Sequence, residues 1–103
     1  MKYDLNELAI DIDHWGADKG ILPNPDAMAQ WTKTLEEVTE LLIAIQTKDR
    51  DEAMDAIGDV FVTLVMQTDA WDCDISECVK KAYDVISKRT GKMVDGQFVK
   101  DSE

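Results

Sequence analysis

Apolar residues recur at spacings of three and four along four segments of the chain, and this spacing predicts four amphipathic helices. The apolar stripe of the first helix contains Leu5, Leu8, Ile12 and Trp15. We expect this helix to end near Gly20, because Pro23 and Pro25 follow and proline does not continue a helix.

Two longer helices are predicted over residues 26–46 and 51–71. The stripe of the second helix consists of Met28, Trp31, Leu35, Val38, Leu42 and Ile45. The stripe of the third consists of Met54, Ile57, Phe61, Leu64, Thr68 and Trp71. Because only residues 47–50 separate the two helices, we expect them to pack as an antiparallel pair along these stripes.

The last part of the chain is predicted to form a fourth helix followed by a short β-hairpin. A fourth helix is predicted over residues 75–89, with Gly91 as its C-cap and with Val79, Ala82, Val85 and Ile86 facing inward. An Asp95-Gly96 turn within residues 93–99 then predicts a small β-hairpin, which we expect to pack on a neighbouring surface. Residues 101–103 are expected to fray.

Three of these helices begin with an aspartate that is followed three residues later by a glutamate, the pattern of a capping box. The pairs are Asp4 and Glu7, Asp49 and Glu52, and Asp74 and Glu77. The prediction is one all-α domain over residues 1–103, of the antiparallel four-helix bundle type, with the β-hairpin as its tail. A chain of 103 residues buries only a modest core, so we expect homo-oligomerisation to complete the fold.

The charge balance excludes several classes of function. The chain carries 11 Lys and Arg against 22 Asp and Glu, a formal net charge of −11. Without a basic patch, such a chain is repelled by nucleic acid and by anionic lipid, so neither is expected as a partner. The apolar runs fall short of the roughly 20 residues of a membrane span. We therefore expect a soluble, cytoplasmic protein in which Cys73 and Cys78 are reduced and structural.

Acidic residues share a face on each of the two long helices. Helical spacing places Lys33, Glu37 and Glu40 together on the second helix, and Asp55 one turn before Asp59 on the third. The residues that continue the face beyond Asp59 are apolar, so we expect that carboxylate to be partly desolvated. Three interpretations stay open: a salt bridge, a divalent cation held between the helices, or a solvated acidic face.

Oxygen ligands without a cysteine or histidine in the group favour Mg²⁺ or Mn²⁺ over zinc. Other metal sites do not fit the sequence, since neither an EF-hand loop nor the paired Glu-x-x-His motifs of a di-iron bundle can be formed. His14, the one histidine, is expected on a helix surface. The glycines are scattered and form no phosphate-binding loop.

The order of these motifs resembles the MazG-like nucleoside triphosphate pyrophosphohydrolases of the all-α NTP pyrophosphatase superfamily, in particular the short phage-type members. Residues 36–40 match the Glu-Glu-x-x-Glu motif of the family, with Gln30 and Lys33 before it. Residues 55–60 resemble the second motif, and Arg89 with residues 91–96 resembles the C-terminal segment. The resemblance covers nearly the whole chain.

The resemblance implies that Glu37, Glu40 and Asp59 are direct Mg²⁺ ligands, with Mn²⁺ as a substitute. It implies supporting roles for Glu36, as a catalytic residue, and for Asp55, as a further ligand or a group that orients water. The second motif departs from the family pattern, which would place a glutamate at Ala56. Asp55 is one residue earlier and can still face the metal.

The implied reaction is the hydrolysis of an NTP or dNTP between the α and β phosphates, which gives the monophosphate and pyrophosphate. The candidates to neutralise the phosphates are Lys33, Lys88, Arg89 and Lys92, of which Lys88 and Lys92 are also explained as solvated residues at helix C-termini. The available groups for the base are Trp15, Gln30 and Trp31, and Trp31 is favoured as a core residue because it lies on the apolar stripe. The resemblance also implies a homodimer or homotetramer in which the site is completed across subunits.

Two other interpretations remain. One is a non-catalytic helical interaction protein whose acidic face binds a basic partner or is only solvated. The other is an inactive homologue of the same fold, because Ala56 stands where the family has an acid.

Overall fold

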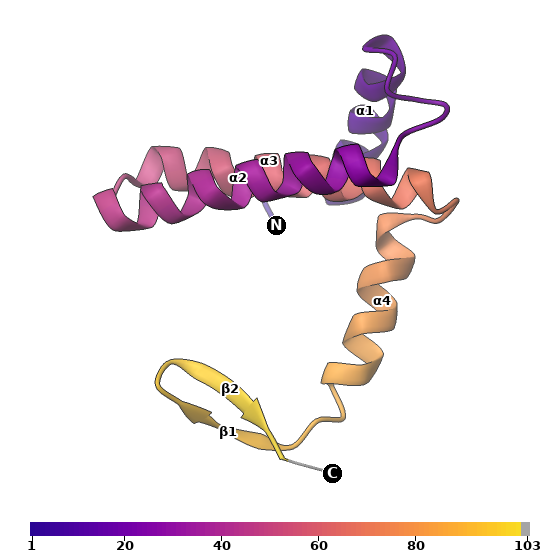
Figure 1. The fold of residues 1–103 in the computed structure, drawn as a ribbon. Coiled ribbons are helices and arrows are strands. Elements are labelled where there is room, and N and C mark those ends of the chain that lie inside the picture. The colour runs from indigo at the N-terminus through magenta and orange to yellow at the C-terminus, as the bar shows by residue number, and fades with distance from the viewer. Residues whose placement is uncertain (102–103) are drawn as a thin grey trace.

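The computed structural model describes residues 1–101 and has four helices followed by a two-stranded sheet. These are α1 (Leu5–Asp18), α2 (Ala27–Thr47), α3 (Arg50–Ala70), α4 (Ile75–Ile86), β1 (Gly91–Val94) and β2 (Gln97–Lys100). The all-α class and the C-terminal hairpin are thereby confirmed. Figure 1 shows α2 and α3 side by side along their lengths, with α1 and α4 leaving opposite sides of this pair at a steep angle. One chain therefore forms a two-helix core that two further helices cross.

Each helix begins at an aspartate whose carboxylate accepts hydrogen bonds from backbone N–H groups of the first turn. These residues are Asp4, Asp26, Asp49 and Asp74. The carboxylate satisfies donors that would otherwise lack partners at a helix start. Among the described residues only Asp74 forms the reciprocal capping box, in which the Glu77 side chain accepts from the Asp74 N–H. The other two predicted boxes are simple caps.

The pair of long helices packs along a face made of small residues. Ala44 of α2 and Ala56 of α3 are each only 3% exposed. Farther along the same face, the Thr34 hydroxyl donates to the Thr63 hydroxyl at 2.8 Å, which links the two helices. Small side chains let the two backbones approach closely, and the hydroxyl pair satisfies the polar atoms enclosed between them.

The predicted antiparallel pairing of α2 and α3 is confirmed, but most of the predicted contact face is wrong, since of the two stripes only Thr68 is buried and only Phe61 is half-buried. Leu42 of the expected α2 stripe is 51% exposed, and Ile57 of the expected α3 stripe is 59% exposed. The same holds for Met28, Trp31, Leu35, Val38, Ile45, Met54, Leu64 and Trp71, all of them exposed. Large apolar side chains thus cover the outside of the helix pair rather than its seam, which leaves them available to another surface.

The first helix packs against α3 at its only buried residue among those described, Gly16. A Cβ at Gly16 would lie 2.7 Å from the sulfur of Met66, which is 1% exposed. The glycine therefore permits a close approach that a larger residue would block. This contact fixes where α1 presents Trp15, the residue just before it.

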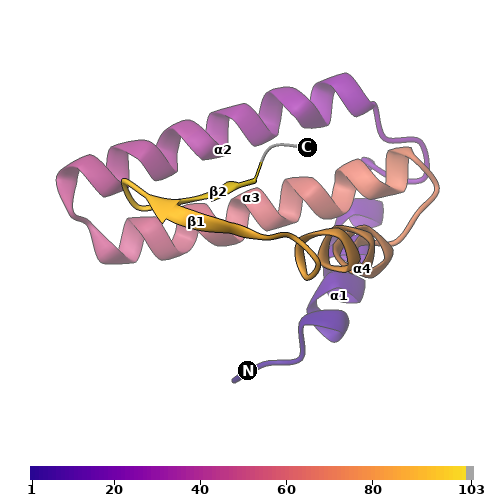
Figure 2. The same ribbon diagram turned by 90° about the horizontal axis from the view of Figure 1, so that it is seen from below.

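The fourth helix and the hairpin, which we call the C-terminal arm (residues 75–101), lie outside the helix pair. The helix α4 descends from one end of the pair, and the hairpin turns back beneath it, set apart from it (Figures 1 and 2). The helix ends at Ile86 rather than at residue 89. Gly91 is not its C-cap but the first residue of β1, where a Cβ would collide with the Val99 carbonyl. The strands pair antiparallel from Gly91 opposite Lys100 to Val94 opposite Gln97.

The predicted Asp95-Gly96 turn is confirmed, since both residues have positive φ, 50° and 80°. Asp101 does not fray: its N–H donates to the Thr90 carbonyl at 2.9 Å. Residues 102–103, also predicted to fray, lie outside the described residues. Every residue of both strands is exposed. None of the helices within residues 1–101 combines the length and apolar content that a membrane span requires.

Candidate metal centre

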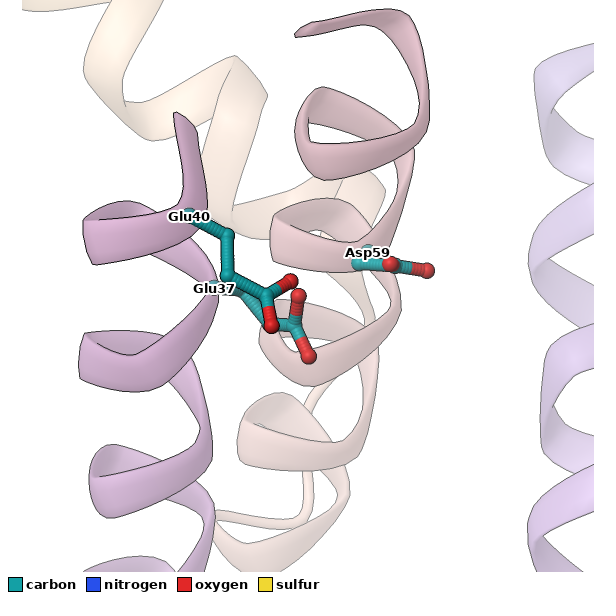
Figure 3. A group of neighbouring side chains, drawn as sticks. All are labelled: Glu37, Glu40 and Asp59. Carbon is teal, nitrogen blue, oxygen red and sulfur yellow. The ribbon is translucent and has the colours of Figure 1, made fainter. Parts of the chain in front are cut away.

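Three carboxylates from the two long helices converge at one place on the helix pair. Glu37 and Glu40 lie one turn apart on α2, and Asp59 extends from α3 (Figure 3). One carboxylate oxygen from each lies within 4.8 Å of the other two. Glu37 and Asp59 are half-buried, whereas Glu40 is exposed. We call these three residues the carboxylate cluster.

The electrostatics of the carboxylate cluster are unfavourable without a counter-ion. Burial, reinforced by Glu40 and then Asp59, raises the pKa of Glu37 to about 7, although Lys33 opposes the shift. Burial also raises the pKa of Asp59, and the neighbouring Asp55 and Glu40 add to this effect. Glu37 Oε2 is enclosed and has no hydrogen-bond partner among the described residues. Such a group gains stability from either a proton or a cation.

Lys33 is the basic side chain nearest to the cluster along α2, but it is engaged elsewhere. Its Nζ lies 3.1 Å from Glu36 Oε2, and this contact raises the pKa of Lys33. The salt bridge is exposed and contributes little to stability. The cluster is therefore a set of hard oxygen donors with a deficit of positive charge, and this donor set fits Mg²⁺ or Mn²⁺.

Two acidic residues that the sequence placed in the site lie beside the cluster rather than in it. Asp55 is exposed and sits next to Asp59, whose pKa it raises, but it is not part of the three-residue group. Glu36 points to its partner Lys33. Ala56, where the family pattern has a glutamate, is buried in the α2–α3 seam.

A cavity of about 440 Å³ opens beside the cluster. The charged residues in its wall are Glu37, Asp59 and Lys33. The rest of its wall consists of Trp15, Ile21, Ala29, Gln30, Val62, Thr63 and Met66. The structure thus brings together three predicted substrate-binding residues, Trp15, Gln30 and Lys33, with two residues of the cluster.

Several residues of this cavity wall were not predicted as site residues. Ile21 belongs to the segment between α1 and α2, and Val62, Thr63 and Met66 belong to α3. Val62 and Met66 continue the helical face of Asp55 and Asp59, and this spacing is the sequence signal that could have identified them.

The predicted phosphate-binding residues Arg89 and Lys92 lie elsewhere in the chain. Arg89 follows the end of α4 and Lys92 lies in β1, so both belong to the C-terminal arm. Neither lines the cavity beside the cluster, and Figure 1 shows the hairpin below the helix pair and set apart from it. Within one chain, therefore, the arm does not supply cations to the carboxylate cluster.

Comparisons with known proteins relate most of the chain to one family. The profile of the MazG nucleotide pyrophosphohydrolase domain matches residues 25–94, which include the whole carboxylate cluster. A similar curated protein is the uncharacterized 18.2 kDa protein in the rep-hol intergenic region of Haemophilus phage HP1, strain HP1c1, with 32% identity over 63 residues. That match spans 61% of this chain and 39% of the phage protein. No solved structure matches the chain.

Proposed function

Because the chain belongs to the MazG nucleotide pyrophosphohydrolase family, we propose that it hydrolyses nucleoside or deoxynucleoside triphosphates between the α and β phosphates, with Mg²⁺ as its cofactor. The observation that carries this proposal is the carboxylate cluster, whose oxygens lie within 4.8 Å of one another at the edge of a cavity. The products are the nucleoside monophosphate and pyrophosphate.

Glu37, Glu40 and Asp59 would hold the cation, and Mn²⁺ would serve in its place. Bound there, the ion would offset the repulsion between an anionic substrate and an acidic protein and would increase the acidity of a water molecule. The enclosed oxygen of Glu37, which has no donor among the described residues, is a ligand atom already withdrawn from bulk water. Asp55, which raises the pKa of its neighbour Asp59, would accept a hydrogen bond from water beside the cluster.

The cavity matches the two chemical parts of a nucleotide. The charged part of its wall, which contains Lys33 and Glu37, suits the phosphates, and the apolar part suits a nucleobase. Trp15 offers an aromatic face for stacking, and Gln30 offers both a donor and an acceptor for the edge of the base. Glu36 holds Lys33 at the rim of the cavity and so acts as a positioning residue in this proposal.

The protein is proposed to act as a homodimer or a homotetramer. The large apolar residues on the outside of α2 and α3 form a surface that one chain leaves exposed. Charge is also segregated, since residues 75–101 carry six Lys or Arg against four Asp or Glu, whereas residues 1–74 carry five against seventeen. A basic arm and an acidic body attract each other between copies, which would bring Arg89 and Lys92 to the cluster of a partner.

The reaction is tested by product analysis on a panel of NTPs and dNTPs, each with Mg²⁺, with Mn²⁺ and with EDTA. We expect pyrophosphate and monophosphate in equal amounts with either metal and neither product with EDTA. Glu40→Gln and Asp59→Asn should abolish turnover while the far-ultraviolet circular dichroism stays helical. Release of orthophosphate alone would show that the cleavage site is different.

The contribution of the arm is tested by mixing two inactive variants. Asp59→Asn removes a ligand, and Arg89→Ala removes the proposed phosphate contact. If Arg89 acts on the cluster of a partner, a mixed dimer contains one intact site and the mixture regains activity. If Arg89 acts within its own chain, the mixture stays inactive. Sedimentation at several protein concentrations shows whether the chains associate.

The inactive-homologue interpretation rests on Ala56, which stands where the family pattern has a glutamate and is 3% exposed. If the chain lacks a required acid, Ala56→Glu should create activity where the wild type has none. Strong wild-type turnover that Ala56→Glu lowers or leaves unchanged would remove this interpretation.

A further inference from the structure

Two cysteines meet at the start of α4. Cys73 immediately precedes the N-cap Asp74, and Cys78 is the residue after the capping-box glutamate Glu77. Their sulfur atoms lie 3.7 Å apart, and both cysteines are free thiols. These two positions are neighbours in helices that begin with a capping box, where they normally carry a pair of apolar side chains. The capping box therefore holds two thiols in contact.

The two cysteines belong to different structural units. The Cys73 N–H donates to the Thr68 carbonyl at 3.1 Å, and its thiol donates to the same carbonyl at 3.5 Å. Thr68 is buried in α3, so Cys73 is attached to the end of that helix. Cys78, by contrast, is an exposed residue of α4. A bond between the two sulfur atoms would join α3 to α4.

We propose that Cys73 and Cys78 form a reversible intrachain disulfide by exchange with a low-molecular-weight disulfide, and that this bond fastens the first turn of α4 to the end of α3. The short turn between the helices carries the whole C-terminal arm (Figure 1). Oxidation therefore restricts the directions in which the arm can leave the helix pair. The bond forms within one chain, because the partner sulfur is already in contact.

The exchange proceeds in two balanced steps. The Cys78 thiolate attacks one sulfur of the small disulfide, whose S–S bond breaks and releases one thiol. The Cys73 thiolate then attacks the Cys78 sulfur of the mixed disulfide and releases the second thiol. Two protein thiols are oxidised, the small disulfide is reduced to two thiols, and the two protons lost by the protein are taken up by those leaving groups.

The surroundings of the two thiols indicate that Cys78, rather than Cys73, attacks the small disulfide first. Burial, assisted by Cys78 and then by Glu77 and Asp69, raises the pKa of Cys73 and so disfavours its thiolate. Cys78 is the more exposed of the two and can reach a reagent in solution. Cys73 is placed to resolve the mixed disulfide, since its sulfur lies within contact distance of Cys78.

The acidic surroundings of the two cysteines also favour positively charged disulfide reagents. A cavity of about 400 Å³ at the turn is lined by Leu22, Pro23, Cys73 and four carboxylates, Asp69, Asp72, Asp74 and Glu77. This acidic wall attracts a cationic disulfide such as cystamine and repels an anionic one such as glutathione disulfide. The difference in rate between these two reagents should shrink as salt is added.

The experiment treats the reduced full-length chain with cystamine, blocks remaining thiols with iodoacetamide and measures the intact mass. We expect a monomer that has lost two hydrogen atoms and takes up no alkylating reagent, and dithiothreitol should restore both thiols. Hydrogen exchange at residues 75–78 should be slower in the oxidised chain. Cystamine should react faster than glutathione disulfide at low salt.

The matched controls are Cys73→Ser and Cys78→Ser. Each should stop at a stable mixed disulfide on the remaining cysteine, and Cys73→Ser, which keeps Cys78, should react faster than Cys78→Ser. A wild-type chain that accumulates mixed disulfides on both cysteines, or that forms disulfide-linked dimers, would overturn the proposal. These masses do not depend on any catalytic activity, so the outcome is independent of the proposed function.

Discussion

Replacement of Glu37 by glutamine distinguishes a metal site from a solvated acidic surface. At a metal site the variant should be more stable than the wild type without metal and less stable than the wild type with metal. Glutamine keeps the size of the side chain but removes the charge. The experiment belongs at pH 8, since the pKa of Glu37 is raised to about 7 and the group must be mostly ionised. Without metal the charged cluster repels itself, and with metal the same charge holds the ion.

The magnitude follows from the geometry of the cluster. At the 4.8 Å upper limit of separation, two unit charges repel by about 0.9 kcal/mol in water. Physiological salt reduces this to roughly half, and the value for water is a lower limit because Glu37 and Asp59 are half-buried. Glu37 faces two carboxylates, so its neutralisation should stabilise the metal-free protein by at least about 1 kcal/mol. For a domain of this size that corresponds to a rise in Tm of roughly 4–8 °C.

Added Mg²⁺ should make the wild type more stable than the Glu37→Gln variant. At a Mg²⁺ concentration of about 100 times Kd, a single site stabilises the wild type by about 2.7 kcal/mol, and the variant should lose most of this gain. Thermal unfolding with MgCl₂, against NaCl of equal ionic strength, measures both effects. Asp11→Asn is the matched control, because it removes one exposed charge from α1 and should leave the Mg²⁺ gain unchanged. A Glu37→Gln variant that keeps the full Mg²⁺ gain would refute the reasoning.

Three further predictions concern the packing and titration of the fold. Asp69 pairs with Asp13, and burial together with this neighbour raises its pKa to about 7. Between about pH 4 and pH 7 the folded state therefore holds a proton that the unfolded state releases, so stability should fall as the pH rises over this range and level off above it. Asp69→Asn should weaken this dependence in pH-resolved urea titrations. Met66→Ala should cost about 2–5 kcal/mol in the same assay, since Met66 is fully buried, and a loss below 1 kcal/mol would contradict the described core. A double-mutant cycle of Thr34→Val and Thr63→Val should give a coupling energy of about 1 kcal/mol for their hydrogen bond, and additivity would deny it.

The helices were predictable because their signals are local. An aspartate followed three residues later by a glutamate indicated three helix starts, and apolar spacings of three and four indicated all four helices to within a few positions. Both are properties of residues close together in the sequence. The Asp95-Gly96 turn is equally local. Gly91 was misassigned because its requirement is tertiary: the opposite strand approaches so closely that a Cβ does not fit.

The contact face of the helix pair could not be predicted from periodicity alone. A large apolar stripe shows that a helix face is buried somewhere, but not against which partner. In α2 the seam instead uses small residues such as Thr34 and Ala44, which follow the same spacing one position away from the stripe. Close approach of two backbones selected small side chains over the larger apolar ones.

The two halves of the candidate site differed in how far the sequence could predict them. Glu37, Glu40 and Asp59 lie together because helical spacing and antiparallel pairing are sufficient to bring them there. Arg89 and Lys92 were joined to them by resemblance, but the direction of the arm depends on the short turn after α3. No local pattern specifies that direction.

The most direct test of the account is to locate the bound metal. Crystals grown with Mn²⁺ and a nucleotide whose α,β bridge is an imido group would show the ion by its anomalous scattering. We expect one or more peaks bounded by the carboxylates of Glu37, Glu40 and Asp59, with the phosphates beside Lys33 in the cavity. Manganese bound elsewhere, or a nucleotide seated away from this cluster, would contradict the account.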